Sequence, residues 1–402
     1  MRETHNDPIQ NLSWRRLYTD AALVWTLLDI LSERKSQPIK NENFWTEAVG
    51  RLDHSIVIAG APGEGRLDLV LDTIEQIQIV YLARNHSPFD TNLPVPPGQD
   101  TARDDPQISG ACLPVPVLSS PPSVSAFRAA HSRTPFILRR FANDWPAICR
   151  RKWASKSYLH NAAGRGRIVP VEIGRDYRTE DWTQRMMGWD EFLDYLFSDT
   201  DSNENPDLDK IDQTKVLYLA QYDLFKQFHS LRRDIVIPDY IYASLSPPDH
   251  YPQYRPPAND EELVLNAWFG PRDTISPAHT DPYFNLYTQV VGRKTVWLAP
   301  PSVSDILSPV SESLNSGVSS PPLLQHHNPT EIGTTNSMLS NTSQLDVFAP
   351  TSDLQKEPKF LQKVVPVAMS AVLEEGDMLF FPPGWWHAFR SETPSFSVSM
   401  WF

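Results

Sequence analysis

The sequence predicts a small α-helical domain followed by a larger, mainly β domain with the form of a barrel or sandwich. Apolar residues recur at helical spacing near the N-terminus, and many short β runs separated by turn residues follow from about residue 113 onward. The chain has 37 prolines against 16 glycines, which suits stiff loops and interrupted strands. At 402 residues it is long enough for two domains, because single hydrophobic cores stop growing near about 250 to 300 residues.

Two apolar stripes with spacings of three and four residues predict the helical domain, which we place at residues 1–85. The first stripe consists of Trp14, Leu17, Ala21, Val24, Leu28 and Leu31, and the second of Leu67, Val70, Ile74, Ile77 and Tyr81. This period is typical of amphipathic helices, and we expect these helices to pack on each other. The same spacing also suits a helix that pairs with a partner in a coiled coil, and the sequence leaves that alternative open.

A linker and then a β domain follow the helices. Residues 86–112 lack periodicity and are rich in Pro, Gly and Asp, which predicts a linker. The β domain is predicted at 113–402 from runs such as "RIVPVEIG", "LVLNAWFG", "KTVWLAP" and "SFSVSMWF". In the last run, Phe396, Val398, Met400 and Phe402 alternate with Ser395, Ser397, Ser399 and Trp401. Residues 302–335 are rich in Ser and Pro, and we expect a flexible insertion there.

The composition argues against several classes of function. The chain carries 36 basic and 49 acidic residues, a net charge of −13, so no general field draws it to nucleic acid, and a basic protein or peptide is the better charged partner. Cys112 and Cys149 are too few for a disulfide scaffold and lack the spacing of a zinc site. We expect an intracellular protein, because no apolar run suits a signal peptide or a membrane span.

A candidate metal site begins at the triplet His279-Thr280-Asp281. Spacing alone decides nothing, because random placement of 11 histidines and 49 acidic residues predicts about one such triplet, and residues 5–7 form another. The triplet at 279, however, follows the run "LVLNAWFG". Because residues i and i+2 of a strand face the same side, an extended chain would aim His279 and Asp281 at one point.

His387 is the candidate third ligand. It lies in "FFPPGWWHAFRS", where a polar ring among apolar residues requires a reason. One alternative is a core histidine bonded to a backbone carbonyl. Together with the triplet, His387 completes two histidines and one carboxylate, the facial triad that leaves coordination positions of Fe(II) open. A structural zinc site would require a closed set of four ligands, and no cysteine is near.

Lys294 offers a further test of the site. The sequence predicts a hairpin of residues 284–291 and 294–299, which would place Asn285 and Lys294 on one face. A straight strand from Asp281 to this turn would carry Lys294 roughly 30 Å from the metal, so we expect a bend at Pro282. After that bend, Lys294 and Asn285 could bind a carboxylate whose other end chelates the metal. A solvated hairpin lysine is the alternative.

Residues 113 to 402 resemble the Jumonji-C group of Fe(II)- and 2-oxoglutarate-dependent dioxygenases. The motifs that carry the resemblance are "WFGPRDTISPAHTDPYFNLYTQVVGRKTVWLAPP" and "EEGDMLFFPPGWWHAFRSETPSFSVSMWF", with "FANDWPAI", "VPVEIGRDY" and "YLAQYDLF". They look most like the subgroup called Jumonji domain-containing protein five or lysine demethylase eight, which also has a helical N-terminal region. The resemblance implies a double-stranded β-helix, a cupin-like jelly roll, with flanking helices.

The resemblance also implies roles for individual residues. The implied Fe(II) ligands and catalytic centre are His279, Asp281 and His387. The implied 2-oxoglutarate pocket consists of Lys294, Asn285, Tyr218, Ser276 and Trp401. The implied contacts to a substrate arginine are Glu172, Trp182 and Trp268. A carboxylate with aromatic faces suits a planar cation, although Glu172 could instead be a surface residue paired with a neighbouring arginine.

The resemblance implies an enzyme that uses Fe(II), 2-oxoglutarate and O₂ to hydroxylate an arginine side chain in a protein. Demethylation of histone N-methyl-lysine at the same metal site is the main alternative, and a non-catalytic interaction module is another. It also implies a nuclear or nucleocytoplasmic location. Tyr283 and Phe284 depart from the subgroup, which commonly has glutamines there, and could alter the substrate entrance.

Overall fold

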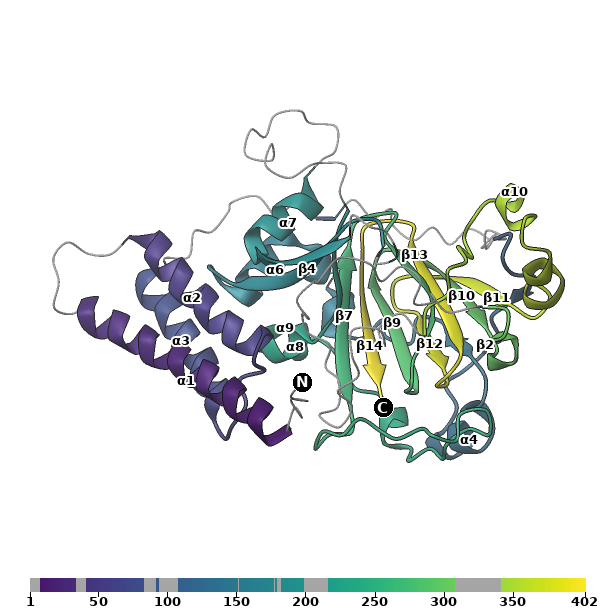
Figure 1. Ribbon diagram of the computed structural model, residues 1–402, viewed down its shortest axis with the longest axis horizontal. Helices are drawn as coiled ribbons and strands as arrows, with labels where there is room; N and C mark the ends of the chain where they lie inside the picture. The colour runs from purple at the N-terminus through teal and green to yellow at the C-terminus, as the bar shows by residue number, and fades with distance from the viewer. Residues whose placement is uncertain are drawn as a thin grey trace, which may run out of the picture.

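The computed structural model describes residues 8–33, 41–82, 92–93, 108–150, 152–176, 178, 182–198, 216–307 and 341–402. Three long helices form one end of the molecule and the strands form the other (Figure 1). The helices are α1 (Pro8–Glu33), α2 (Glu42–Val57) and α3 (Arg66–Tyr81). No helix in these ranges is long and apolar enough to cross a membrane.

The second apolar stripe folds as predicted, on α3. Val70, Ile74 and Ile77 are buried against α2 residues in one core cluster, and Trp45 of α2 stacks on Tyr81 with ring centroids 3.8 Å apart. Helix α2 begins at the N-cap Asn41, whose side chain accepts a hydrogen bond from the Phe44 N–H. These two helices pack through their apolar faces.

The first stripe, on α1, does not pack as predicted. Its large members are exposed, from 43% for Leu31 to 69% for Trp14. Helix α1 instead buries a different face, on which Thr19, Ala22 and Thr26 lie. The expectation that this stripe packs inside the helical domain is therefore wrong.

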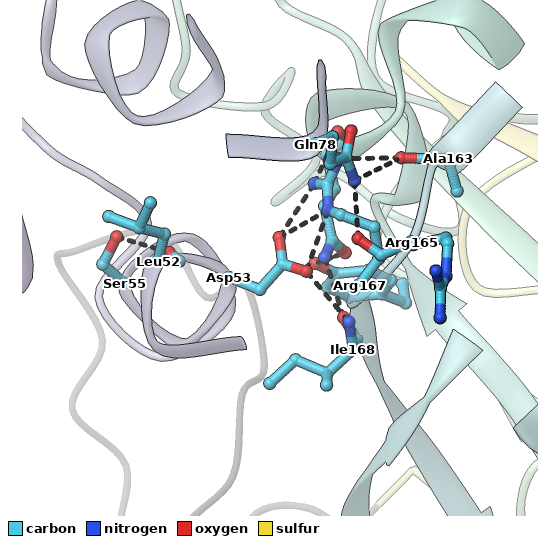
Figure 2. A network of polar contacts seen from close by, with 10 residues as sticks. Leu52, Asp53, Ser55, Gln78, Ala163, Arg165, Arg167 and Ile168 are labelled. Carbon is cyan, nitrogen blue, oxygen red and sulfur yellow. Dashed lines mark hydrogen bonds and ion pairs between the residues drawn. The ribbon is translucent and has the colours of Figure 1, made fainter. Parts of the chain in front are cut away.

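A buried polar network joins the helices to the β part of the chain (Figure 2). Asp53 of α2 accepts hydrogen bonds from the Arg167 guanidinium at 2.8 to 3.0 Å and from the Ile168 N–H at 2.9 Å. Gln78 of α3 donates to the carbonyls of Ala163 and Arg165. Because these groups satisfy each other away from water, the network fixes the helices against the start of strand β4.

Two β-sheets form a jelly-roll core, which confirms the mainly β fold and the helical N-terminal region. One sheet has the order β1-β11-β10-β13-β8 and the other β2-β3-β12-β9-β14-β7-β6-β4-β5. The strands are β1 (Leu113–Pro114), β2 (Val117–Leu118), β3 (Phe136–Leu138), β4 (Ile168–Ile173), β5 (Thr183–Gly188), β6 (Leu217–Tyr222), β7 (Val264–Gly270), β8 (Ile275–Thr280), β9 (Asn285–Val291), β10 (Lys294–Ala299), β11 (Met369–Leu373), β12 (Met378–Phe381), β13 (Trp386–Ser391) and β14 (Ser395–Trp401).

Short helices flank the sheets. They are α4 (Val124–Ala126), α5 (Pro146–Cys149), α6 (Lys156–Ala163), α7 (Trp189–Phe197), α8 (Leu224–Gln227), α9 (His229–Arg232) and α10 (Thr351–Leu354). Helix α7 has the clearest amphipathic pattern: Trp189, Phe192 and Leu193 are fully buried in the main core cluster. This cluster covers the outer face of the large sheet.

The predicted hairpin is wrong, because β9 and β10 belong to different sheets. Strand β9 pairs with β12 and β14, whereas β10 pairs with β11 and β13. The chain crosses between the sheets at Gly292, which has φ +77 and where a Cβ atom would lie 2.1 Å from the Pro394 carbonyl oxygen. Only glycine fits this crossing. Lys294 therefore meets the β9 residues across the interior, between the two sheets.

The predicted bend at Pro282 is confirmed. Strand β8 lies in the five-stranded sheet and β9 in the nine-stranded sheet, so the chain changes sheets between Thr280 and Asn285. The alternation predicted for β14 is also confirmed: Phe396, Val398, Met400 and Phe402 all belong to the main core cluster. The serines between them are buried on the opposite face, toward the barrel interior, where Ser397 bonds Gln289.

The predicted linker and insertion lie mostly outside the described residues. Within the linker, Leu93 is buried and its N–H donates to the Ala154 carbonyl, and Ile108 and Ala111 are buried in a core cluster. Within residues 302–307, Val303 and Leu307 are buried in that same cluster. Residues 302–307 are therefore packed structure, and residues 308–335 of the predicted insertion lie outside the described residues.

Candidate metal and carboxylate site

Three predicted ligands converge at one end of the barrel. His279 is the second-last residue of β8 and lies directly opposite His387 on β13, and Asp281 follows in the turn. Asp281 Oδ2 is 3.2 Å from His387 Nε2, and Asp281 Oδ1 is 3.8 Å from His279 Nε2. The three ligand atoms all lie within 4.8 Å of one another. The cross-strand register therefore brings together side chains more than a hundred residues apart.

Backbone carbonyls orient both imidazoles toward this point. His279 Nδ1 donates to the Pro277 carbonyl at 2.8 Å, and His387 Nδ1 donates to the Trp385 carbonyl at 3.0 Å. Because a carbonyl can only accept, each Nδ1 carries a hydrogen and each Nε2 is the ring nitrogen turned toward the common point. Two Nε2 atoms and a carboxylate then face one another, an arrangement that suits a metal ion.

The protonation states suit metal binding. Burial, reinforced by the neighbouring His387, lowers the pKa of His279 to about 4, so its ring is neutral. Burial acts to raise the pKa of Asp281, but the two imidazoles outweigh it and hold that pKa below its usual value. The Gly384 N–H also donates to the Asp281 carbonyl at 2.8 Å, which fixes the turn. A set of two histidines and one carboxylate fits Fe(II) with open positions.

Lys294 lies buried inside the barrel, so it is not the solvated lysine considered above. It is 1% exposed, and its Nζ donates to the hydroxyls of Tyr218 at 3.1 Å and Tyr287 at 3.0 Å. No carboxylate in the described chain pairs with it. Burial alone lowers the pKa of Lys294 to about 7, and an anionic ligand would restore its charge.

We call the surroundings of Lys294, with Tyr218, Tyr287, Asn285, Ser276 and Trp401, the lysine pocket. Two buried polar atoms in it have no partner among the described residues. Asn285 and Trp401 lie directly opposite each other on β9 and β14. Asn285 Oδ1 and Trp401 Nε1 are buried and have no hydrogen-bond partner within the described ranges. Ser276 bonds the Tyr218 hydroxyl. Because buried polar groups are normally paired, these atoms fit a polar ligand such as a dicarboxylate between Lys294 and the triad.

Glu172 lies on β4, directly opposite Tyr218 on β6. The two side chains therefore lie on the same face of the sheet, and Tyr218 belongs to the lysine pocket. Its oxygens accept long hydrogen bonds from Trp182 Nε1 at 3.3 Å and Gln184 Nε2 at 3.4 Å. Burial raises the pKa of Glu172 to about 7. A cleft lined by Glu172, Gln184, Met186 and Gln221, among others, opens here. No arginine in the described residues pairs with Glu172.

The structure brings the two predicted tryptophans to different places. Trp182 contacts Glu172, whereas Trp268 donates to the Ser399 hydroxyl at 2.9 Å and lies beside Tyr218, with ring centroids 6.3 Å apart. Trp268 therefore lies toward the lysine pocket and is not among the residues that line the Glu172 cleft.

Tyr283 and Phe284 are the two residues that depart from the subgroup, and only Tyr283 lies at the site. Tyr283 stacks on Trp401, with ring centroids 5.4 Å apart and planes at 29°. Phe284 packs in the core against Tyr254 and Phe380. A change of specificity through this pair would therefore act through Tyr283.

Sequence reasoning missed several contributors. Gln184 lies in β5, two residues after Trp182, so the alternation of an extended chain could have found it. No sequence signal pointed to residues 341–343, which extend the small sheet beside His279: Asn341 Nδ2 donates to the Thr280 carbonyl at 2.7 Å, and the Ser343 N–H donates to the Ala278 carbonyl at 2.8 Å. Tyr287 is also absent from the predicted site residues, and its hydroxyl accepts a hydrogen bond from Lys294 Nζ at 3.0 Å.

Comparisons with known proteins agree with this geometry. Residues 124–402 match the family described as Cupin-like domain. The chain is 36% identical over 269 residues to the lysine-specific demethylase JMJ30 of Arabidopsis thaliana, covering 67% of this chain and 50% of that protein. It is 35% identical over 301 residues to lysine-specific demethylase 8 of Xenopus tropicalis, covering 72% and 55%. It is 30% identical over 399 residues to lysine-specific demethylase 8 of Danio rerio, covering 97% and 81%. The chain thus spans about half the length of the first two relatives.

Proposed function

The chain belongs to the JmjC family of cupin-like proteins, and from this we propose that it is an Fe(II)- and 2-oxoglutarate-dependent dioxygenase that hydroxylates an arginine side chain in a protein substrate. The observation that carries the choice of substrate is Glu172, a carboxylate that shares a cleft with polar and aromatic groups and a strand face with the lysine pocket. The net charge of −13 also favours a basic substrate.

In this proposal, His279, Asp281 and His387 hold the iron. When bound, Fe(II) with O₂ and 2-oxoglutarate supplies the oxidising chemistry, coupled to decarboxylation of 2-oxoglutarate to succinate. The protein contributes two imidazoles and one carboxylate, and the carbonyls of Pro277 and Trp385 orient the imidazoles. Three protein ligands would leave coordination positions of the ion open to the co-substrates.

Lys294 is proposed to bind the far carboxylate of 2-oxoglutarate. Its ammonium would gain the anion that the buried pocket lacks, and the hydroxyls of Tyr218 and Tyr287 already hold it in place. Burial raises the pKa of both phenols, so they remain neutral donors. Asn285 and Trp401 present the buried unpaired atoms beside them, and Ser276 fixes Tyr218.

Glu172 is proposed to receive the substrate guanidinium. Its two long hydrogen bonds from Trp182 and Gln184 leave acceptor capacity on both oxygens. A planar guanidinium can bond both oxygens at once, whereas a methylated ammonium is usually held by a cage of aromatic rings. Trp182 offers an aromatic face beside the carboxylate, and Trp268 would bound the passage toward the lysine pocket. We infer hydroxylation for this reason.

Demethylation of N-methyl-lysine in a histone is the second candidate. The names of the Arabidopsis and Xenopus relatives favour it, and the same metal site would serve it. A third possibility, a non-catalytic interaction module, is disfavoured by the complete triad together with the unpaired Lys294.

Mass spectrometry of peptides distinguishes these readings. Purified protein with Fe(II), 2-oxoglutarate and O₂ is incubated with arginine-containing or methyl-lysine peptides, and succinate is measured in parallel. Gain of one oxygen on arginine is expected. Loss of a methyl group would show demethylation instead, and no change in peptide or succinate would favour the module.

Two variants locate the activity. His279→Ala should abolish both succinate formation and peptide oxidation, because it removes an iron ligand. Glu172→Gln should lower peptide hydroxylation by about 30-fold or more, since a buried charge pair is lost, while slow succinate formation without peptide continues. If Glu172→Gln hydroxylates arginine peptides as well as the wild type does, the assigned substrate site is wrong.

A further inference from the structure

Helix α1 presents an apolar surface that stays largely exposed among the residues that the structure describes. In heptad notation, Trp14, Ala21 and Leu28 occupy positions a, and Leu17, Val24 and Leu31 occupy positions d. All six are exposed. Tyr18 and Trp25, at the adjoining e positions, are 46% and 63% exposed. We call these eight residues the α1 seam.

The opposite face of α1 attaches the helix to its own domain. Thr19 and Thr26, at positions f, are fully buried, and Ala22 is 6% exposed. Arg15 donates to the Ala59 carbonyl at 2.7 Å, and Asp29 accepts from Arg51 at 2.8 Å. The helix is thus anchored through the side that carries Thr19, Ala22 and Thr26, with Leu23 and Ile30 packed against the same core cluster. The α1 seam lies on the side that faces away from the domain. Figure 1 shows α1 along the outer edge of the helical part.

The seam is large enough for a stable interface. From their exposed fractions, its members and the neighbouring Leu27 present on the order of 1,000 Å² of apolar surface, against about 800 Å² per partner in a standard interface. The largest apolar patch on a typical monomer is about 300 to 600 Å². Positions a, d and e carry no charged residue between Trp14 and Ser32, so nothing on this face favours exposure to water.

The seam is also complementary to itself in an antiparallel pair. With two copies aligned about a point between Ala21 and Val24, each a position meets a d position of the other copy. Trp14 then meets Leu31, Leu17 meets Leu28, and Ala21 meets Val24, so each large or small residue meets a partner of compatible size. A parallel pair would set Trp14 against Trp14 and Ala21 against Ala21, which leaves layers of very unequal width. An antiparallel pair also opposes the two helix dipoles favourably.

We propose that the α1 seam binds the α1 seam of a second copy of this chain, forming an antiparallel two-helix interface and hence a homodimer. The pairing is isologous, as expected for a two-fold dimer, because the same patch serves on both copies. It leaves the metal site and the Glu172 cleft on the part of each copy that α1 does not contact.

Analytical ultracentrifugation of the full chain over a range of concentrations tests the pairing. The wild type should dimerise reversibly. Leu17→Glu and Leu28→Lys should each raise the dimer dissociation constant about a hundredfold or more, since each places two unpaired charges in the interface. Both side chains are more than half exposed in a single copy, at 55% and 60%, so circular dichroism should show unchanged helix content. Val236→Glu, at a 51% exposed residue outside α1, is the matched control.

The double variant Leu17→Glu with Leu28→Lys tests the orientation. In the antiparallel pair each Glu meets a Lys of the other copy, so dimerisation should recover relative to either single variant; in a parallel pair like charges would meet and weaken it further. A monomer at all concentrations, or a dimer that no seam variant weakens, would overturn the proposal. A dimer lost in both single variants and not recovered in the double variant would overturn the antiparallel arrangement.

Discussion

Two buried cations of this protein, Arg167 and Lys294, have opposite surroundings. Arg167, where the helices meet the sheet, is 6% exposed and fully paired: Asp53 accepts from its Nε and Nη2, Gln227 offers a carbonyl, and the Phe228 ring lies 4.7 Å away. Lys294, inside the barrel, is 1% exposed, and among the described residues its Nζ donates to two phenol hydroxyls and to no carboxylate. Figure 2 shows the hydrogen bonds that join Asp53 to Arg167 and to Ile168.

The difference separates a structural charge from a functional one. Burial of a charge costs several kcal/mol unless a counter-charge compensates it. At Arg167 the chain supplies that counter-charge, so the pair holds the helices and the sheet together. At Lys294 the described part of the chain supplies none, and burial lowers the pKa of the lysine instead. An unpaired cation in a rigid pocket is what a site for a carboxylate ligand requires.

The comparison predicts that breaking the paired cation destabilises the protein most. Asp53→Asn keeps the shape of the side chain but leaves Arg167 buried without a counter-charge, so the free energy of unfolding should fall by about 3 to 5 kcal/mol. Urea denaturation measures it. Asp20→Asn breaks the solvent-exposed pair with Arg66 and should change stability little. If the two variants behave alike, the Arg167 network does not hold the structure in the way described.

Removing the cation of Lys294 should have the opposite effect: it should weaken ligand binding and leave stability intact. Lys294→Met should weaken 2-oxoglutarate binding by about 2 to 5 kcal/mol, yet leave the free energy of unfolding of the ligand-free protein unchanged or raised. Isothermal titration calorimetry and thermal unfolding measure the two effects. Lys226→Met is the matched control, because Lys226 donates to the Gly60 carbonyl and lies near Asp223, outside the pocket. Wild-type affinity in Lys294→Met would remove the assignment of this pocket.

The smallest predicted effect is a pH dependence of 2-oxoglutarate binding. With the pKa of Lys294 lowered to about 7, the ligand-free lysine is charged below pH 7 and neutral above it. A bound carboxylate favours the charged form, so binding above pH 7 must take up a proton. Affinity should be level below pH 7 and fall by up to about tenfold, or 1.4 kcal/mol, per pH unit above it.

Calorimetry in buffers of different ionisation enthalpy checks this directly. At pH 8 the heat of binding should vary with the buffer, by an amount that corresponds to uptake of up to one proton, and at pH 6 it should not. An affinity that does not change between pH 6.5 and 8.5 would show that Lys294 is already charged before the ligand binds.

Part of the site could be predicted from the sequence because strand geometry is local. His279 and Asp281 were predicted to point together from their spacing, and a bend was predicted at Pro282; the structure brings the ligands together and places the bend there. The predicted hairpin failed for a related reason. A two-residue connection cannot reveal whether the next strand pairs with its neighbour or crosses to the facing sheet, and here Gly292 makes the crossing.

The contributions of residues 341–343 and Gly384 were not predictable. They act mainly through backbone hydrogen bonds to a ligand strand or ligand turn that is distant in the chain, and the Asn341 side chain adds one bond to the Thr280 carbonyl. Backbone groups carry no residue-specific signal, so only the assembled sheets reveal which carbonyl or N–H they meet.

The sequence by itself determined the period of each element: the helical stripes on α1 and α3, the alternation along β14, and the residue types able to bind a metal. Only the tertiary structure decided which face each element buries. The stripes on α1 and α3 have the same spacing, yet α3 buries Ile74 and Ile77 while α1 exposes Trp14 and Leu28. Periodicity is a property of the local backbone, whereas burial depends on which surfaces meet, and that is fixed by contacts between segments far apart in the chain.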